Sequence, residues 1–326
     1  MKAYGDVMVF AEQREGKIHP ISYELLGKGR EIADKLGVEL SSVLLGCQME
    51  DTRELINYGA DKVFVYEHPV FREFDILNYK HNIVKLAREV KPEIFLFGAT
   101  RLGRSLAPRI AAALNTGLTA DCIGLEVDEN GNLVQIRPAF TGNILAQIKT
   151  TTRPQMATVR YKVMAKKPRD SNRTGEMIAK NTEIVPSLLT IIKKEKLGEF
   201  NITEADVIVS GGRGLKKSDD FSLLAELAGL LGGVVGSSRP LVDDGWIARE
   251  HQVGFSGNTV KPKFYIACGI SGSPQHLAGM RGSDIIIVIN TDPSAPIFRV
   301  ADYGIIGDLY EVVPKLASEI RRRRSE

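Results

Sequence analysis

Three apolar, β-rich runs in the second half of the chain end in glycine and serine, and this pattern constrains the fold most. The runs cover residues 207–214, 234–240 and 264–272. Glycine lets a backbone approach a phosphate closely, and the amide N–H groups at the start of a following helix supply a compensating positive field. Three such strand ends in one short domain predict a cradle for a long, anionic, nucleotide-like ligand.

The composition is that of a soluble globular protein with room for two domains, since the chain has 326 residues, 43% of them hydrophobic and 25% charged. The net charge is small, at +3, and the arginine run at residues 321–324 contributes to it. This run is expected to be a solvated helix end. No basic stripe is interleaved with aromatic residues, so we expect no nucleic-acid binding.

We expect a cytoplasmic protein without direct membrane insertion. Residues 7–10 already look like a strand, with no apolar signal-peptide core before them, and no apolar stretch approaches the roughly 20 residues that span a bilayer. Cysteines occur singly at positions 47, 122 and 268, and no cluster has metal-ligand spacing. We therefore expect no metal, and any redox chemistry would need an organic cofactor.

The first half of the chain alternates strand and helix patterns, which predicts an α/β domain with a parallel sheet. Strands are expected at 7–11, 42–46, 62–66 and 94–98, and helices at 22–36, 52–58, 76–90 and 102–114. Further strands at 125–127, 133–139, 144–149 and 156–161 predict that this domain finishes with an antiparallel or mixed set.

The second half predicts a doubly wound parallel sheet, whose ligands bind at the carboxyl ends of the strands. Helices are expected at 221–231, at 274–280 and from Ile306 onward, a strand at 285–290 and a short one near 298–301. Between the halves, residues 164–200 are charged and poorly patterned. We assign residues 1–195, including this connection, to a scaffold domain and residues 196–326 to a ligand-binding domain.

Five residues near the strand ends could carry binding chemistry, and each also has an ordinary structural interpretation. Arg213 and Arg239 suit a pyrophosphate or stay solvated in turns. His276 lies in the first turn of a helix, where it binds a ligand or is a capping or surface residue. Asn290 and Asp308 can bond ribose or adenine edges, or serve as a turn residue and a helix cap. No catalytic nucleophile is recognisable: there is no G-x-S-x-G motif, and Cys268 is expected to be buried.

Taken together and in order, the motifs of the second half resemble the electron transfer flavoprotein α-subunit family. They are residues 210–215, 236–240, 252–254, 269–272, 275–280, 289–293, 295–298 and 301–305. The resemblance implies one FAD in a deoxyhypusine-synthase-like second domain, a heterodimer with a β subunit, and electron exchange with acyl-CoA dehydrogenases or similar flavoenzymes. The implied FAD contacts are Arg213, Ser238, Arg239, Val253, Gly254, Phe255, Ser256, Ser271, Gly272, Ser273, Pro274, Gln275, His276, Asn290, Asp308 and Leu309.

The resemblance also divides these residues by role. His276 is the implied donor or cation near N1 and the C2 carbonyl of the flavin, where the anionic one-electron-reduced ring carries its charge. Ser256 takes the hydroxyl position near N5, and Arg239 lies against the ring. Arg213, Asn290 and Asp308 would serve the ADP half.

Three motifs of the first half, at residues 118–122, 137–140 and 153–160, look like α subunits from anaerobes, several of which bifurcate NADH electrons between ferredoxin and an enoyl-CoA reductase. In that group a second FAD lies largely in the β subunit. Residues 98–104 are interpreted as a helix start. Two alternatives remain from the residues: an NAD-dependent enzyme of the deoxyhypusine-synthase-like type, and a nucleotide-sensing module without a tightly bound redox cofactor.

Overall fold

The computed structural model describes residues 4–139, 144–187, 189–192 and 201–325. These residues fall into two compact units that divide between residues 192 and 201. Both units are α/β with a parallel sheet, which confirms the predicted fold class. The expected boundary between residues 195 and 196 lies outside the described residues. None of the described helices is long and apolar enough to cross a membrane.

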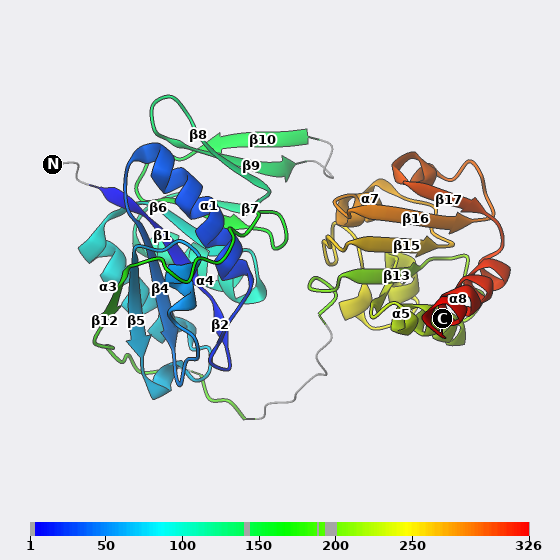
Figure 1. The fold of residues 1–326 in the computed structure, drawn as a ribbon, viewed down its shortest axis with the longest axis horizontal. Coiled ribbons are helices and arrows are strands. Elements are labelled where there is room, and N and C mark those ends of the chain that lie inside the picture. Colours follow the sequence, from blue (N-terminus) through cyan, green and yellow to red (C-terminus); the bar gives the residue numbers. More distant parts are fainter. Residues whose placement is uncertain (1–3, 140–143, 188, 193–200, 326) are drawn as a thin grey trace. The chain divides into compact units, whose positions relative to one another are not determined.

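The first unit is built on a seven-stranded parallel sheet (Figure 1). Its strands pair in the order β12, β5, β4, β1, β6, β11, β7, so neighbours in space are mostly distant in sequence. Five of the strands were predicted, with ends that differ by two residues or fewer. The bounds are β1 Gly5–Ala11, β4 Leu40–Gly46, β5 Lys62–Glu67, β6 Pro92–Gly98, β7 Leu118–Cys122, β11 Gln155–Val159 and β12 Glu176–Ala179.

Helices cover both faces of this sheet because alternate side chains of each strand point to opposite faces. Val7 and Val9 of β1 pack in one core with α1 (Ile21–Leu36), and Met8 and Phe10 pack in the other with α3 (Ile76–Val90) and α4 (Arg101–Ala113). Local signals fix the helix starts: the Asp75 side chain accepts hydrogen bonds from the first-turn N–H groups of α3. A short α2 (Glu54–Asn57) packs in the first of these cores, and the 3-10 turn η1 (Pro69–Phe71) packs in the second.

The strands after α4 separate into two groups, as a mixed set requires. β8 (Gly124–Val127), β9 (Leu133–Ala139) and β10 (Ile144–Lys149) form an antiparallel three-stranded sheet, whereas β7 and β11 return to the parallel sheet. A small hairpin of β2 (Gln13–Arg14) and β3 (Lys17–Ile18) follows β1. The strands predicted at residues 133–139 and 144–149 are β9 and β10, which have those bounds.

The charged stretch that looked like an interdomain connection belongs, up to residue 187, to the first unit. Its strand β12 pairs with β5 at the edge of the sheet. Arg169 makes two hydrogen bonds of 2.7 Å to Glu54, and the backbone N–H of Glu183 donates to Asn82. The sequence pattern hid this packing because the segment is held by ion pairs and an edge strand rather than by periodic apolar residues.

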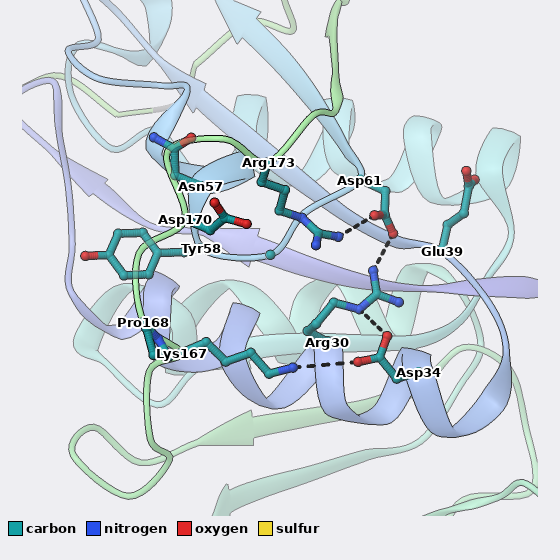
Figure 2. Close-up of a pocket in the computed structure, with 11 residues that line it drawn as sticks. Arg30, Asp34, Glu39, Asn57, Tyr58, Asp61, Lys167, Pro168, Asp170 and Arg173 are labelled. Atoms are coloured by element: carbon teal, nitrogen blue, oxygen red, sulfur yellow. Dashed lines mark hydrogen bonds and ion pairs between the residues drawn. The ribbon is translucent and has the colours of Figure 1, made fainter.

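Figure 2 shows a pocket of about 560 Å³ where this segment meets the first unit. It lies beside the amino ends of β4 and β5, since Glu39 and Asp61 directly precede those strands. Its charged residues pair with one another: Arg30 contacts Asp34 and Asp61, and Arg173 contacts Asp61 at 2.6 Å. No predicted cofactor contact lines it. We interpret the pocket as an ion-pair network that fastens the segment, at the edge opposite the one where such sheets bind ligands.

The second unit is a five-stranded parallel sheet in the order β14, β13, β15, β16, β17, with helices on both faces. One core contains α5 and α8, and the other contains residues of α7 and η5. The predicted helix 274–280 and strand 285–290 are found at those bounds. The strands are β13 Val207–Gly211, β14 Val234–Ser237, β15 Phe264–Cys268, β16 Ile285–Asn290 and β17 Tyr303–Ile306, and the helices are η3 Ser218–Asp220, α5 Phe221–Leu230, α6 Arg239–Asp243, η4 Arg249–His251, α7 Pro274–Met280, η5 Pro296–Val300 and α8 Leu309–Ser325.

Two expectations near the end of the chain were wrong. The stretch near residues 298–301 is the end of the 3-10 turn η5, and the last strand, β17, follows it. The closing helix starts at Leu309 rather than Ile306. All four residues of β17 are exposed, so this edge strand lacks the alternation of buried and exposed residues from which a strand is recognised.

Asp61→Asn should destabilise the first unit at neutral pH. Burial raises the pKa of Asp61, but the Leu40 N–H, Arg30 and Arg173 outweigh it, so the net pKa is lowered. The stabilisation is then present above the unfolded pKa of about 4 and is lost as the pH falls through the folded value. Because the carboxylate is partly exposed, we expect a loss of about 1–2 kcal/mol at pH 7 in urea unfolding.

The matched control is Asp34→Asn, which removes the more exposed partner of Arg30 and should cost about 0.5 kcal/mol or less. Equal losses for the two variants, or a loss for Asp61→Asn that persists unchanged at pH 3, would contradict this account of the network.

Candidate functional site

The second sheet has a switch point between β13 and β15. The chain leaves β13 toward α5 on one face and leaves β15 toward α7 on the other, as the separate cores of these helices show. In open α/β sheets ligands bind in the crevice that this divergence opens at the carboxyl ends of the strands. The glycine-rich runs noted in the sequence end at this edge.

Backbone hydrogen bonds join the loops after β13 and β15. Gly212 and Gly214 donate to the carbonyls of Cys268 and Gly269, both at 3.0 Å. A Cβ atom on Gly212 would lie 2.5 Å from the Gly269 oxygen, and one on Gly214 would lie 2.6 Å from the Gly269 Cα. The first duty of these glycines is therefore to let two loops touch.

The loop at residues 252–258 is fastened between β14 and α7. Val253 donates its N–H to the Ser237 carbonyl at 2.9 Å, and Phe255 donates to the Gln275 carbonyl at 2.8 Å. Within the loop the Gln252 side-chain amide donates to Ser256 Oγ at 3.2 Å. Phe255 itself is 56% exposed. The backbone thus fastens Phe255, next to Ser256, to the first turn of α7.

The turn from β15 into α7 offers backbone donors. Gly272 has a φ of +86°, and a Cβ atom there would lie 2.6 Å from the backbone nitrogen of Ile297. Ser273 caps the helix by accepting the His276 N–H, and Pro274 occupies the first helical position. Within the described residues the N–H groups of Ser271 and Gly272 donate to no other group.

His276 is only 5% exposed, and one of its ring nitrogens has no hydrogen bond. Nε2 lies 3.0 Å from the hydroxyl of Tyr265, whereas Nδ1 is buried and has no hydrogen-bond partner within the described part of the chain. Burial lowers the pKa of His276 to about 4, although the nearby Val253 backbone offsets part of this effect. The imidazole is therefore neutral at physiological pH, and of the two predicted roles, donor or cation, it fits the donor.

Tyr265 was missed in the sequence because it sits in an apolar strand run and has the pattern of an ordinary core aromatic. It is fully buried in β15, one strand position away from exposed Phe264. The signal that could have found it is the phenol itself, since a buried tyrosine hydroxyl usually has a hydrogen-bond partner. That partner is His276.

The two predicted arginines lie at the same edge. Arg213 is exposed in the loop after β13, and its side chain makes no ion pair or hydrogen bond with the described residues. Arg239 begins α6 and pairs with Asp243 of the same helix at 3.0 Å. Ser238, before it, is buried and donates its N–H to the Gly211 carbonyl at 2.9 Å. The structure therefore brings Ser238 against the end of β13.

Three further predicted residues already have structural partners at this edge. The Asn290 amide donates to the Ile270 carbonyl at 2.9 Å and accepts from the Asp292 N–H at 3.0 Å. Asp308 accepts from the Tyr310 N–H at 2.9 Å, which makes it a helix cap. Leu309 is a core residue, 4% exposed, that packs against the glycines at 214 and 269.

At the equivalent edge of the first sheet, two side chains bond to each other. Glu12, at the end of β1, is 1% exposed and accepts a hydrogen bond of 2.5 Å from Thr100 at the end of β6. Thr100 also caps α4 by accepting the Gly103 N–H at 3.0 Å. Residues 98–104 are thus a helix start, as expected, and the Glu12–Thr100 bond joins the ends of β1 and β6.

Comparison with known proteins places both units in one family. Residues 7–184 match the family described as "Electron transfer flavoprotein domain", and residues 201–281 match "Electron transfer flavoprotein FAD-binding domain". The electron transfer flavoprotein subunit alpha of Thermoanaerobacterium thermosaccharolyticum is 51% identical, with 99% of each chain covered. The chain belongs to the electron transfer flavoprotein α-subunit family.

Other relatives carry related names. Protein FixB of Clostridium saccharobutylicum is 49% identical over 98% of this chain and 97% of its own length. Subunit LctC of a lactate dehydrogenase (NAD(+),ferredoxin) from Acetobacterium woodii is 46% identical over 97% of this chain and 77% of its own length. The second unit described above is therefore the flavin-binding domain of an electron transfer flavoprotein α subunit.

Gly272→Ala tests how the carboxyl edge is packed. Alanine would have to adopt the strained left-handed conformation of Gly272, and its Cβ atom would also clash with the Ile297 backbone. We therefore expect the free energy of unfolding in urea to fall by about 3 kcal/mol or more, together with reduced flavin content.

Gly232→Ala is the matched control, because Gly232 has a φ of +66° but nothing within 4 Å of a Cβ atom. It should cost only about 1–2 kcal/mol, the backbone part alone, and leave flavin content unchanged. Equal losses in the two variants would show that the contact with Ile297 is unimportant.

Proposed function

We propose that the flavin is FAD and that it lies along the carboxyl edge of the second sheet, over the loops that follow β13, β14 and β15. The observation that carries this proposal is the buried, neutral His276, whose Nδ1 lacks a partner among the described residues. Buried polar atoms in native proteins are nearly all hydrogen-bonded, and an exception calls for a ligand or an unseen partner. The pyrimidine side of a flavin, where N1 and the C2 carbonyl accept hydrogen bonds, is a fitting partner for His276.

The ring of the flavin would be held by His276, Ser256 and Arg239. FAD supplies one- and two-electron chemistry, while these residues orient the ring and favour added negative charge on it. Arg239 reaches the ring only by leaving its exposed pair with Asp243, and an exposed helix pair of this kind contributes about 0.3–0.5 kcal/mol. That rearrangement therefore costs little.

The ADP half would be held by Arg213 and by backbone donors. Arg213 has no competing ion pair among the described residues, and a guanidinium suits a pyrophosphate. Asn290 and Asp308 keep their structural bonds and would offer the remaining N–H and carboxylate oxygen. Ser271 and Gly272 would add their N–H groups. Val253, Gly254, Phe255, Ser273, Pro274, Gln275 and Leu309 would contribute mainly by the shape of the loops.

We infer a heterodimer with an electron transfer flavoprotein β subunit that exchanges electrons with acyl-CoA dehydrogenases or similar flavoenzymes in the cytoplasm. Family membership supports the pairing with a β subunit and with flavoenzyme redox partners. The division of the scaffold at residues 1–195 from the FAD domain at 196–326 remains our proposal for where the two parts meet.

A more specific candidate function is electron bifurcation with NADH and ferredoxin. The name of the Acetobacterium relative includes both NAD(+) and ferredoxin. In this chain Arg160 is half-buried, and burial with the neighbouring Arg104 and Arg137 lowers its pKa, although Asp121 opposes the effect. These arginines belong to or adjoin the motifs that resemble anaerobic α subunits. They would present positive charge to a second, anionic FAD held largely by the β subunit.

The proposal predicts a yellow complex. The chain co-purified with its β subunit should show the absorption of oxidised flavin, and the cofactor released by denaturation should run as FAD on chromatography. Two flavins per heterodimer and reduction by NADH would support bifurcation, while one flavin without NADH reduction would leave a simple carrier. A colourless complex, or FMN alone, would defeat the FAD proposal.

Arg213→Ala should weaken FAD binding about tenfold or more, the loss of a charge-assisted hydrogen bond, without changing stability. Binding is measured by titrating FAD into the flavin-depleted complex. Arg281→Ala is the control, because Arg281 follows the carboxyl end of α7 and is equally exposed. Equal affinities for both variants would remove Arg213 from the site.

A further inference from the structure

Tyr265 and His276 form an isolated polar contact inside the core of the second unit. Tyr265 is 0% exposed and His276 is 5% exposed, and the phenol oxygen lies 3.0 Å from Nε2. The two residues come from different elements, β15 and α7, so the contact fixes the imidazole relative to the sheet. An apolar residue would fill the position of Tyr265 equally well if packing were its only duty.

The chemistry of the two groups decides which one donates. The unprotonated nitrogen of an imidazole, whose conjugate acid has a pKa near 6.5, is a much better acceptor than a neutral phenol oxygen. The phenol O–H therefore points to Nε2.

A donor at Nε2 sets the tautomer of the ring. A neutral imidazole carries one proton, so an Nε2 that accepts leaves the proton on Nδ1. Nδ1 is the buried ring nitrogen that has no hydrogen-bond partner among the described residues, although the Val253 backbone lies near the ring. The contact with Tyr265 thus leaves an N–H group, rather than a lone pair, at Nδ1.

We propose that Tyr265 is a positioning residue that holds His276 in the Nδ1–H tautomer, so that the imidazole donates a hydrogen bond to the bound flavin. This inference rests on the proposed function, which places the flavin next to His276. It adds a residue that never touches the cofactor yet determines whether His276 can stabilise negative charge on it. With the opposite tautomer, Nδ1 would turn a lone pair toward the ring and oppose that charge.

The direct test is ¹⁵N NMR of the heterodimer labelled at histidine, in its flavin-bound and flavin-depleted forms. One-bond ¹⁵N–¹H couplings show which ring nitrogen carries the proton, and His276→Asn identifies the signals of His276 among the five histidines. We expect the proton on Nδ1 in both forms. In Tyr265→Phe it should move wholly or partly to Nε2, whereas Tyr310→Phe, a control in the same unit whose hydroxyl contacts Asp220, should change nothing. A proton on Nε2 in the unaltered protein overturns the proposal.

A double-mutant cycle separates positioning from packing. Asparagine at position 276 offers an N–H donor close to the Nδ1 position and has no tautomers. Tyr265→Phe should lower the equilibrium constant for forming the one-electron-reduced flavin about threefold to tenfold when His276 is present, the size of one hydrogen bond. In the His276→Asn background the same change should alter it less than about twofold. Equal effects in both backgrounds would make Tyr265 a packing residue only.

The outcomes separate this inference from the function on which it rests. A complex without flavin defeats the proposed function, while the tautomer can still be measured in the flavin-depleted protein. A complex with FAD in which His276 carries its proton on Nε2 defeats the inference alone. Should Tyr265→Phe fail to fold, the couplings of the unaltered protein still decide the matter.

Discussion

The close backbone contact between the loops after β13 and β15 is the constraint on which the rest of the second unit depends. It needs glycine at positions 212, 214 and 269, because a Cβ atom on any of them would lie within 2.7 Å of the opposite loop. Two backbone hydrogen bonds, from Gly212 and Gly214, hold these loops together at the switch point of the sheet. Further backbone hydrogen bonds fasten the loop at 252–258 to β14 and to the start of α7.

This contact changes the meaning of the glycine-ended strands. The sequence suggested that their glycines exist to admit a phosphate. In the structure their immediate neighbours are other loops of the same unit, and the groups left for a ligand are the side chains of Arg213 and His276 and the N–H groups of Ser271 and Gly272. The glycines thus mainly hold the loops of this edge together, whereas other groups present donors to a ligand.

Much of the fold could be predicted because it is local. The strand at 285–290 is an uninterrupted apolar run, and the helix at 274–280 begins with a serine cap and a proline. Neighbouring residues therefore indicate where each of these two elements lies. The edge strands β12 and β17 were missed, since their side chains are mostly exposed and their pairing depends on distant partners. The charged segment before residue 188 was misjudged for the same reason, because its partners are acids and arginines from other elements.

The candidate site divides in the same way. Motif order was enough to point to Arg213, Arg239 and His276, and the structure brings their segments to one edge. Motif order could not reveal that His276 is neutral, that Nδ1 lacks a hydrogen-bond partner among the described residues, or that Nε2 contacts Tyr265, because these follow from burial and from a contact between two elements. Asp308 has the helix-cap role that the sequence allowed, whereas Leu309 is a core residue, a role that its motif does not disclose.

The most direct measurement of the central claim is a crystal structure of the heterodimer with FAD bound. The account predicts Nδ1 of His276 within hydrogen-bond distance, about 2.7–3.2 Å, of the N1 or C2-carbonyl edge of the flavin, with Tyr265 still bonded to Nε2. A flavin bound elsewhere, or an Nδ1 that faces only protein atoms, would contradict it.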